Sequence, residues 1–211
     1  MVSNKDQLPR VFQANLDRFF DRVILPAMNG LPFHGVLETG QAETLDQFLD
    51  RAAAQVDNYT GSEAAKAFCL TLAGLFERQL SIWARALQDA GEAGMSGLQG
   101  FESLLARCAR HARIDLAAEP LGADLTELFV VANVVRHGEG RSCDRLRAIA
   151  PSLWDDMAED YFDLLPGARV ASEHVRIGMP ELLRYIRAAT RFWGLADPLP
   201  MAVTNPPYGA G

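Results

Sequence analysis

The chain has 211 residues, 49% of them hydrophobic and 22% charged, which suits a globular protein with one sizeable core. Its formal net charge of −7 argues against constitutive binding to a nucleic-acid backbone, which usually requires a basic surface. No apolar run is long enough to span a membrane, and "MVSNKDQLPR" lacks the apolar stretch of a secretory signal. Three widely spaced cysteines match no paired metal or redox motif. We therefore expect a cytoplasmic protein with no membrane association.

Helical periodicity dominates the first half of the chain. Apolar residues recur every three or four positions over 8–28 and again over 43–59, and "AMNGLPFHG" separates the two segments with Gly and Pro. Ser62 is a good N-cap residue, which predicts that a third, long helix begins there and ends before Gly91. The same periodicity predicts a fourth helix over 98–114.

In the second half, the segment 123–137 is apolar on nearly every side, which predicts the central buried helix of the fold. Gly138 suits the left-handed conformation that often follows a helix, and Ser142 predicts the cap of a short helix. Helical patterns recur over 154–165 and 181–193, whereas 168–178 is ambiguous and could hold a short strand.

Together these elements predict an all-α fold, a bundle of about six to eight helices in a single domain over residues 1–195. The main core is expected over 42–195, with 8–28 as an N-terminal helical extension. Residues 196–211 are rich in Pro and Gly and are expected to form a loosely ordered tail. Because 123–137 is too apolar for one protomer to cover easily, we also expect a homodimer packed along it.

A cluster of polar residues interrupts the apolar pattern where the predicted 123–137 helix ends. Asn133 and His137 are four residues apart and therefore share a helix face. The helix dipole favours a protonated imidazole at His137, to which Glu139 could add, and the Arg136 guanidinium suits a phosphate. An acid–base group beside a phosphate-binding group is what metal-free cleavage of an RNA phosphodiester needs.

The same residues also have a purely structural interpretation. His137 could cap the helix, Asn133 could bond to the backbone, and Arg136 could pair with an acid. Local chemistry by itself favours this structural interpretation. Seven arginines lie between residues 107 and 147, and the simplest interpretation is that they cover solvated helix faces.

Other motifs predict no chemistry. "NPPY" at 205–208 equals the tetrapeptide with which amino-group DNA methyltransferases hold a flipped base, but no α/β cofactor domain accompanies it, so we interpret the match as accidental. The four histidines are scattered, and we expect no metal and no cofactor. A DNA-binding regulator is disfavoured, because the net charge is acidic and no helix-turn-helix with a basic recognition helix stands out.

The segment "NVVRHGEGRS", followed by "CDRLRAI", resembles the HEPN superfamily, in which a phrase of the type N-x-x-K/R-H-G-x-G-x-S closes the site helix. The earlier "LAGLFERQL" is similar to the amphipathic helix that packs beside it. The resemblance covers about residues 125–146 and, more loosely, 62–87. It implies an α-helical, metal-independent endoribonuclease, or an inactive relative, of toxin–antitoxin, abortive-infection or CRISPR systems. It also implies a homodimer whose site helices face each other across one RNA cleft.

By this resemblance His137 matches the family's histidine and Asn133 stands for its polar companion. The family's arginine has no counterpart, because the positions five to seven residues before His137 are apolar. Arg136, or Arg141 beyond the turn, would then have to supply the positive charge to RNA. Two functions follow from the resemblance. The first is a HEPN-like endoribonuclease that acts in bacterial antiviral defence or in a toxin–antitoxin pair, with a cognate antitoxin as a further partner. The second is a non-catalytic helical regulator that binds a protein or a nucleotide.

Overall fold

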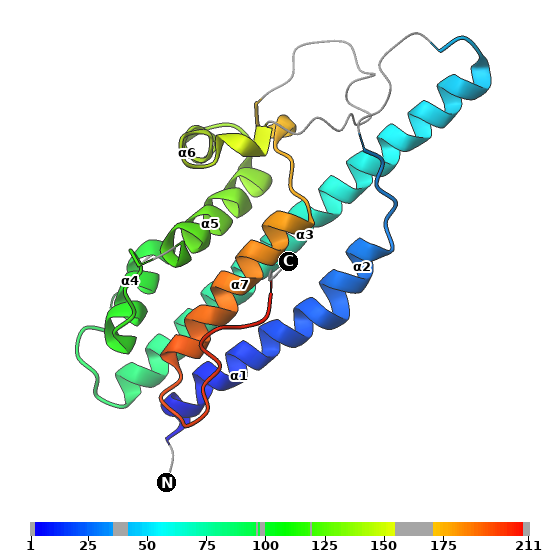
Figure 1. The fold of residues 1–211 in the computed structure, drawn as a ribbon. Helices are drawn as coiled ribbons and strands as arrows, with labels where there is room; N and C mark the ends of the chain where they lie inside the picture. Colours follow the sequence, from blue (N-terminus) through cyan, green and yellow to red (C-terminus); the bar gives the residue numbers. More distant parts are fainter. Residues whose placement is uncertain are drawn as a thin grey trace.

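The computed structural model describes residues 3–35, 42–95, 97, 100–118, 120–154 and 171–208, which form an all-α bundle without any strand (Figure 1). The α-helices are α1 (Asn4–Phe19), α2 (Leu25–Asn29), α3 (Leu45–Asp89), α4 (Phe101–Ala112), α5 (Leu121–His137), α6 (Arg141–Ile149) and α7 (Met179–Ala196). A π-helical segment, Phe20–Ile24, joins α1 to α2. The predicted all-α class is therefore confirmed. None of these helices combines the length and the apolarity that crossing a membrane requires.

The largest difference from the sequence prediction is α3, a single helix of 45 residues where two helices were expected. Its N-cap is Thr44, whose hydroxyl accepts a backbone hydrogen bond at 3.2 Å, and Ser62 lies inside the helix instead of capping one. Gly61 costs a helix about 1 kcal/mol relative to alanine. The buried positions nevertheless stay in phase across it, since Asn58 and Ala65 are two turns apart on one buried face. Packing of that continuous face outweighs the local preference for a break.

The middle of the bundle is taken by α7, which packs against α1, α3, α4 and α5 (Figure 1). Phe192 and Trp193 of α7 are completely buried. The Trp193 ring packs on Phe12 of α1 and Phe76 of α3, with ring centroids 4.9 and 5.7 Å apart. The hydrophobic helix that the sequence predicted is present as α5, but it packs against α3, α6 and α7 and shares the core with them.

The first helix contributes side chains to this core. Leu16 on α1, together with Phe20 and Ile24 in the following π-helical segment, is almost or fully buried. The indole N–H of Trp83, on α3, donates to the backbone carbonyl of Lys5 at 3.0 Å. Because α1 packs against α7 and α3, it contributes to the same core, and the division into a main core over 42–195 and an N-terminal extension over 8–28 stays a prediction.

The C-terminal tail runs back along α1 as far as Tyr208 (Figure 1). The side-chain amide of Gln13 donates to the carbonyl of Val203 at 2.8 Å, and the Tyr208 hydroxyl donates to Asp17 at 2.6 Å. Burial and this hydrogen bond raise the pKa of Tyr208 above its ordinary value. The tail is thus anchored by more contacts than its Pro- and Gly-rich composition suggested.

Two further sequence predictions concern the segment before α7. Only Trp154 of the predicted helix 154–165 is described, as the last residue of the 3₁₀ turn Pro151–Trp154, and the remainder lies outside the described residues. The ambiguous segment 168–178 is described from residue 171 onward, where it forms a 3₁₀ turn, Ala171–His174, and then extended chain without a strand partner among the described residues. The indole N–H of Trp154 donates to the Ala171 carbonyl at 2.8 Å and ties the two turns together.

Candidate functional site

α5 ends at His137 because two glycines turn the chain sharply into α6. Gly138 has φ 71° and Gly140 has φ 133°, conformations that residues with a Cβ rarely adopt. The Gly138 N–H donates to the Val134 carbonyl, in the last turn of α5, at 2.8 Å. α6 begins at Arg141 with Gly140 in the N-cap position, so Ser142 is not the cap that the sequence predicted.

The four predicted site residues lie at this end of α5 and the start of α6. Arg136, His137 and Arg141 are exposed, and Asn133 is half-buried one turn before His137. No side-chain hydrogen bond or ion pair joins any of the four to another described residue. The described part of the chain therefore gives Arg136 no acidic partner, which the structural interpretation required.

Glu139 bonds to Ser172, and not to His137 as the sequence suggested. Its carboxylate accepts the backbone N–H of Ser172, and the Cys143 thiol donates to it at 3.9 Å. The hydrogen bond from the Ser172 backbone is the main reason why the pKa of Glu139 lies below its ordinary value. This contact brings the 3₁₀ turn Ala171–His174 alongside the glycine turn, although 33 residues separate Glu139 from Ser172.

The arginines that cluster in the sequence separate in the structure. Arg145 of α6 forms an ion pair with Glu102 of α4. The Arg147 guanidinium lies over the Trp154 ring, 5.5 Å from its centroid, where a cation is attracted to the ring face. Arg145 and Arg147 are therefore engaged by an acid and by an aromatic ring. Arg136 and Arg141 lie at the turn between α5 and α6.

Most apolar side chains of α5 are covered within one protomer, and Phe129 and Val135 are half-buried. Leu125, Leu128, Val131 and Val134 are each at most 2% exposed. The sequence analysis expected a homodimer because α5 is so apolar that one protomer would not cover it easily. The burial of these side chains within one protomer removes that argument. A homodimer remains a proposal that rests on the family resemblance.

A buried polar network, which the sequence analysis missed, fixes α5 against α7. Arg184 donates to Asp124 at 2.6 Å and to Glu127 through both of its terminal nitrogens, and the Tyr185 hydroxyl donates to Glu127 at 2.6 Å. Burial raises the pKa of Asp124, while Arg184 opposes the rise. Two acids three residues apart in an otherwise apolar helix were the visible sequence feature. Their partners, about 60 residues away, were not.

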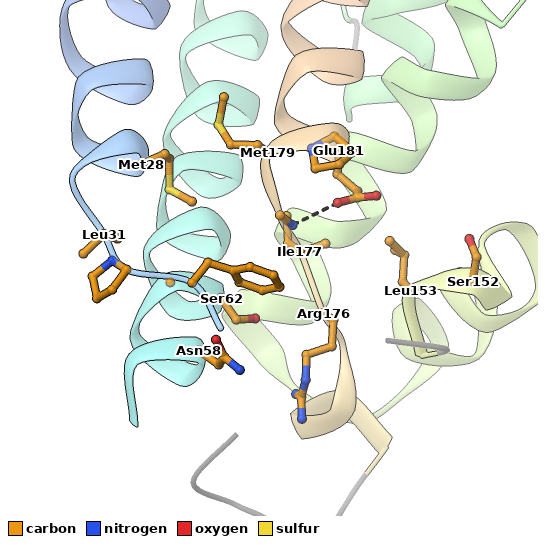
Figure 2. Close-up of a pocket in the computed structure, with 15 residues that line it drawn as sticks. Met28, Leu31, Asn58, Ser62, Ser152, Leu153, Arg176, Ile177, Met179 and Glu181 are labelled. Atoms are coloured by element: carbon orange, nitrogen blue, oxygen red, sulfur yellow. Dashed lines mark hydrogen bonds between the residues drawn. The ribbon is translucent and has the colours of Figure 1, made fainter. Parts of the chain in front are cut away.

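A cavity of about 560 Å³ lies between the end of α2, the middle of α3 and the segment that leads into α7 (Figure 2). Its polar lining comes from Asn58, Ser62, Ser152, Arg176 and Glu181, and most of the remaining wall is apolar. Four segments of the chain build it, the fourth being the 3₁₀ turn with Ser152 and Leu153, and one of its walls crosses the point where the sequence predicted a break between helices. Sequence patterns therefore gave no indication of this site.

Comparisons with protein-family models, with curated proteins and with solved structures found no match for this chain. Among the described residues, no three His, Cys, Asp or Glu side chains gather in a way that could hold a metal ion. The HEPN resemblance thus stands on the residues around the end of α5 and on the all-α class.

Proposed function

We propose that the chain is a HEPN-like, metal-independent endoribonuclease whose active site is the end of α5. The observation that carries the proposal is that Arg136, His137 and Arg141 are exposed around one sharp turn, with no bond to another described residue that would occupy them. An imidazole and two guanidinium groups at one helix end supply proton transfer and phosphate binding together. The bacterial defence or toxin–antitoxin setting, and a cognate antitoxin as partner, come from the resemblance alone.

In the proposed reaction the imidazole of His137 takes the proton of an RNA 2′-hydroxyl. The 2′-oxygen then attacks the adjacent phosphorus, and the 5′-oxygen leaves with a proton, giving a 2′,3′-cyclic phosphate and a 5′-hydroxyl. Arg136 and Arg141 stabilise the charge that develops on the phosphorane oxygens. Asn133, one turn before His137, orients the imidazole or the RNA backbone. In the proposed homodimer, a second copy of the histidine protonates the leaving oxygen.

The decisive experiment is cleavage of single-stranded and transfer RNAs in the presence of a chelator. His137→Ala should lower the rate by about 10²–10⁴-fold, the usual contribution of a proton-transfer group. His111→Gln, on α4, is the matched control and should cleave like the wild type. If the wild type leaves every RNA intact across salt and pH, or if His137→Ala stays within a few-fold of it, the proposal fails.

The phosphate role is tested separately with Arg136→Ala. Loss of one phosphate contact should weaken RNA binding and flatten its dependence on salt concentration. Arg85→Ala, which removes an exposed charge from α3, is the control for net charge. Asn133→Ala should have an effect between those of Arg136→Ala and His137→Ala. Equal salt slopes for Arg136→Ala and Arg85→Ala would contradict the assignment of Arg136 to a phosphate.

The second candidate is a non-catalytic helical protein that binds a protein partner. Exposed apolar side chains on the first turns of α3 favour it, since they recur at helical spacing and are 47% to 70% exposed: Leu45, Phe48, Leu49 and Val56. Such a stripe is typical of a docking surface for another chain. The two functions differ in one outcome, because a folded His137→Ala variant should keep its cellular phenotype only if the protein is non-catalytic.

A further inference from the structure

The cavity between α2, α3 and α7 has the size of a small-molecule site. Its volume of about 560 Å³ lies inside the range of roughly 300–1,000 Å³ in which proteins bind small organic ligands. Its described lining residues all lie outside the turn between α5 and α6, so it is distinct from the proposed ribonuclease site. The chemistry of a ligand depends on which groups of the lining still face the cavity.

The two charged side chains of the described lining are both engaged by neighbouring backbone. The Arg176 guanidinium donates to the Glu173 carbonyl at 3.1 Å. The Glu181 carboxylate accepts the Gly178 N–H at 2.9 Å, as the dashed line in Figure 2 marks. The formal charges of Arg176 and Glu181 are opposite and cancel within the lining. A charged ligand would therefore lose water without gaining a counter-ion of its own, which is unfavourable.

The uncharged polar side chains offer a ligand little more. The Asn58 amide is engaged by the backbone of His34, through bonds of 2.8 and 2.9 Å. The Ser62 hydroxyl is buried and has almost no accessible surface. Ser152 is exposed, so water already reaches it. The surface that a ligand would cover in this cavity is therefore mainly apolar.

Methionine and aromatic side chains give this apolar surface its character. Met28 of α2 and Met179 at the start of α7 line the cavity from two different helices (Figure 2). A methionine sulfur makes favourable contacts with aromatic rings, and its unbranched side chain adapts to the shape of a ligand. Phe33 also lines the cavity and is 72% exposed, so its ring is available for a stacked or edge-to-face contact with a second ring.

We propose that this cavity binds an uncharged, largely apolar small molecule that carries an aromatic ring. The ring lies against the two methionines and Phe33. The molecule brings no charged group, because the charges of Arg176 and Glu181 are already engaged. This proposal goes beyond RNA cleavage and holds whether or not the chain is a ribonuclease.

Gly61 offers a direct way to fill the cavity without straining the fold. It lines the cavity, it lies inside α3, and a Cβ added there meets no atom within 4 Å. Gly74 of the same helix also has nothing within 4 Å of an added Cβ but does not line the cavity. Both substitutions to leucine favour the helix by similar amounts. Gly61→Leu and Gly74→Leu therefore form a matched pair that differs in the bulk placed in the cavity.

The probe is 2-naphthol, which is uncharged at pH 7, and isothermal titration calorimetry measures its binding to the full chain. We expect 2-naphthol to bind the wild type and Gly74→Leu equally. It should bind Gly61→Leu at least about ten-fold more weakly, because the leucine occupies space that the ring needs. Near-UV circular dichroism verifies that both variants are folded. The proposal is overturned if 2-naphthol does not bind the wild type at millimolar concentration, or if the two glycine variants bind it equally.

A charged probe with the same ring system tests the absence of a counter-ion. We expect 2-naphthoate, which is ionised at pH 7, to bind the wild type at least about ten-fold more weakly than 2-naphthol, because its carboxylate finds no unengaged partner in the cavity. If 2-naphthoate binds as tightly as 2-naphthol, the ligand is not restricted to uncharged molecules and the proposal fails.

Phe33→Leu tests the preference for an aromatic ring, with 1-octanol as a probe that has no ring. Loss of one aromatic contact should weaken binding of 2-naphthol by about 2–10-fold and leave binding of 1-octanol nearly unchanged. Phe48→Leu, which changes an exposed phenylalanine of α3 outside the cavity, is the control and should bind both probes like the wild type. Equal losses for the two probes in Phe33→Leu would contradict the assignment of an aromatic ligand.

Discussion

Replacing Arg184 by methionine should expose how much the polar network between α5 and α7 contributes to stability. Asp124 and Glu127 are only 7% and 8% exposed, and Arg184 is their shared cation. The variant keeps a long apolar side chain on α7, so packing changes little. It leaves two poorly hydrated carboxylates without their ion-pair partner, while the charge of Arg187 still acts on Asp124 and the hydrogen bond from Tyr185 to Glu127 remains.

The size of the effect follows from burial. Removing one partner of a buried ion pair commonly costs about 3–5 kcal/mol. The Arg184 side chain is 38% exposed, so water already screens part of the interaction, and we expect about 2–3 kcal/mol. For a domain of this size, such a loss lowers the melting temperature by about 4–12 °C.

The pH dependence of this loss has a definite sign. Burial already raises the pKa of Asp124, and removing Arg184 raises it further. A carboxyl whose pKa is higher in the folded state than in the unfolded state favours folding at low pH, and this benefit disappears as pH rises through the folded-state pKa. The deficit of Arg184→Met should therefore be largest at pH 7 and should shrink towards pH 4.

Urea unfolding and thermal melting of four proteins test this expectation. Arg85→Met is the control, because it removes an exposed arginine of α3 that lies outside this network and should stay within about 0.5 kcal/mol of the wild type. Adding Glu127→Gln to Arg184→Met should restore part of the stability, since the amide removes one buried charge and still accepts from Tyr185. The reasoning is refuted if Arg184→Met melts like Arg85→Met, or if the double variant is no more stable than Arg184→Met.

Three further outcomes are expected. Because the Ser172 backbone lowers the pKa of Glu139, Glu139→Gln should lose stability above pH 4.5, and its difference from the wild type should vanish as pH falls through the lowered pKa, as measured by urea unfolding. Gly138→Ala should cost about 1–3 kcal/mol in thermal melting, because φ at this position is 71°. In Gly194→Ala the new Cβ would lie 1.9 Å from the Val203 carbonyl oxygen, so limited proteolysis should release the tail faster than in the wild type.

The sequence by itself determined the elements whose causes are local. Helical periodicity predicted the all-α class. The apolar run before Gly138 predicted that α5 ends at His137, because the glycines that end the helix directly follow it in the sequence. The shared face of Asn133 and His137 followed from the same local pattern, because residues four apart lie on one side of any α-helix.

Where local preferences compete with packing, only the tertiary structure decided which conformation the chain adopts. Gly61 and Ser62 favour a break, but α3 continues because its buried face keeps the same phase on both sides of them. The hydrogen bond between Glu139 and Ser172, and the bonds between Arg184 and the acids of α5, join residues that are far apart in the chain. The cavity likewise exists only because α2, α3 and the start of α7 meet. Such contacts depend on how whole helices pack, and periodicity within one segment carries no information about them.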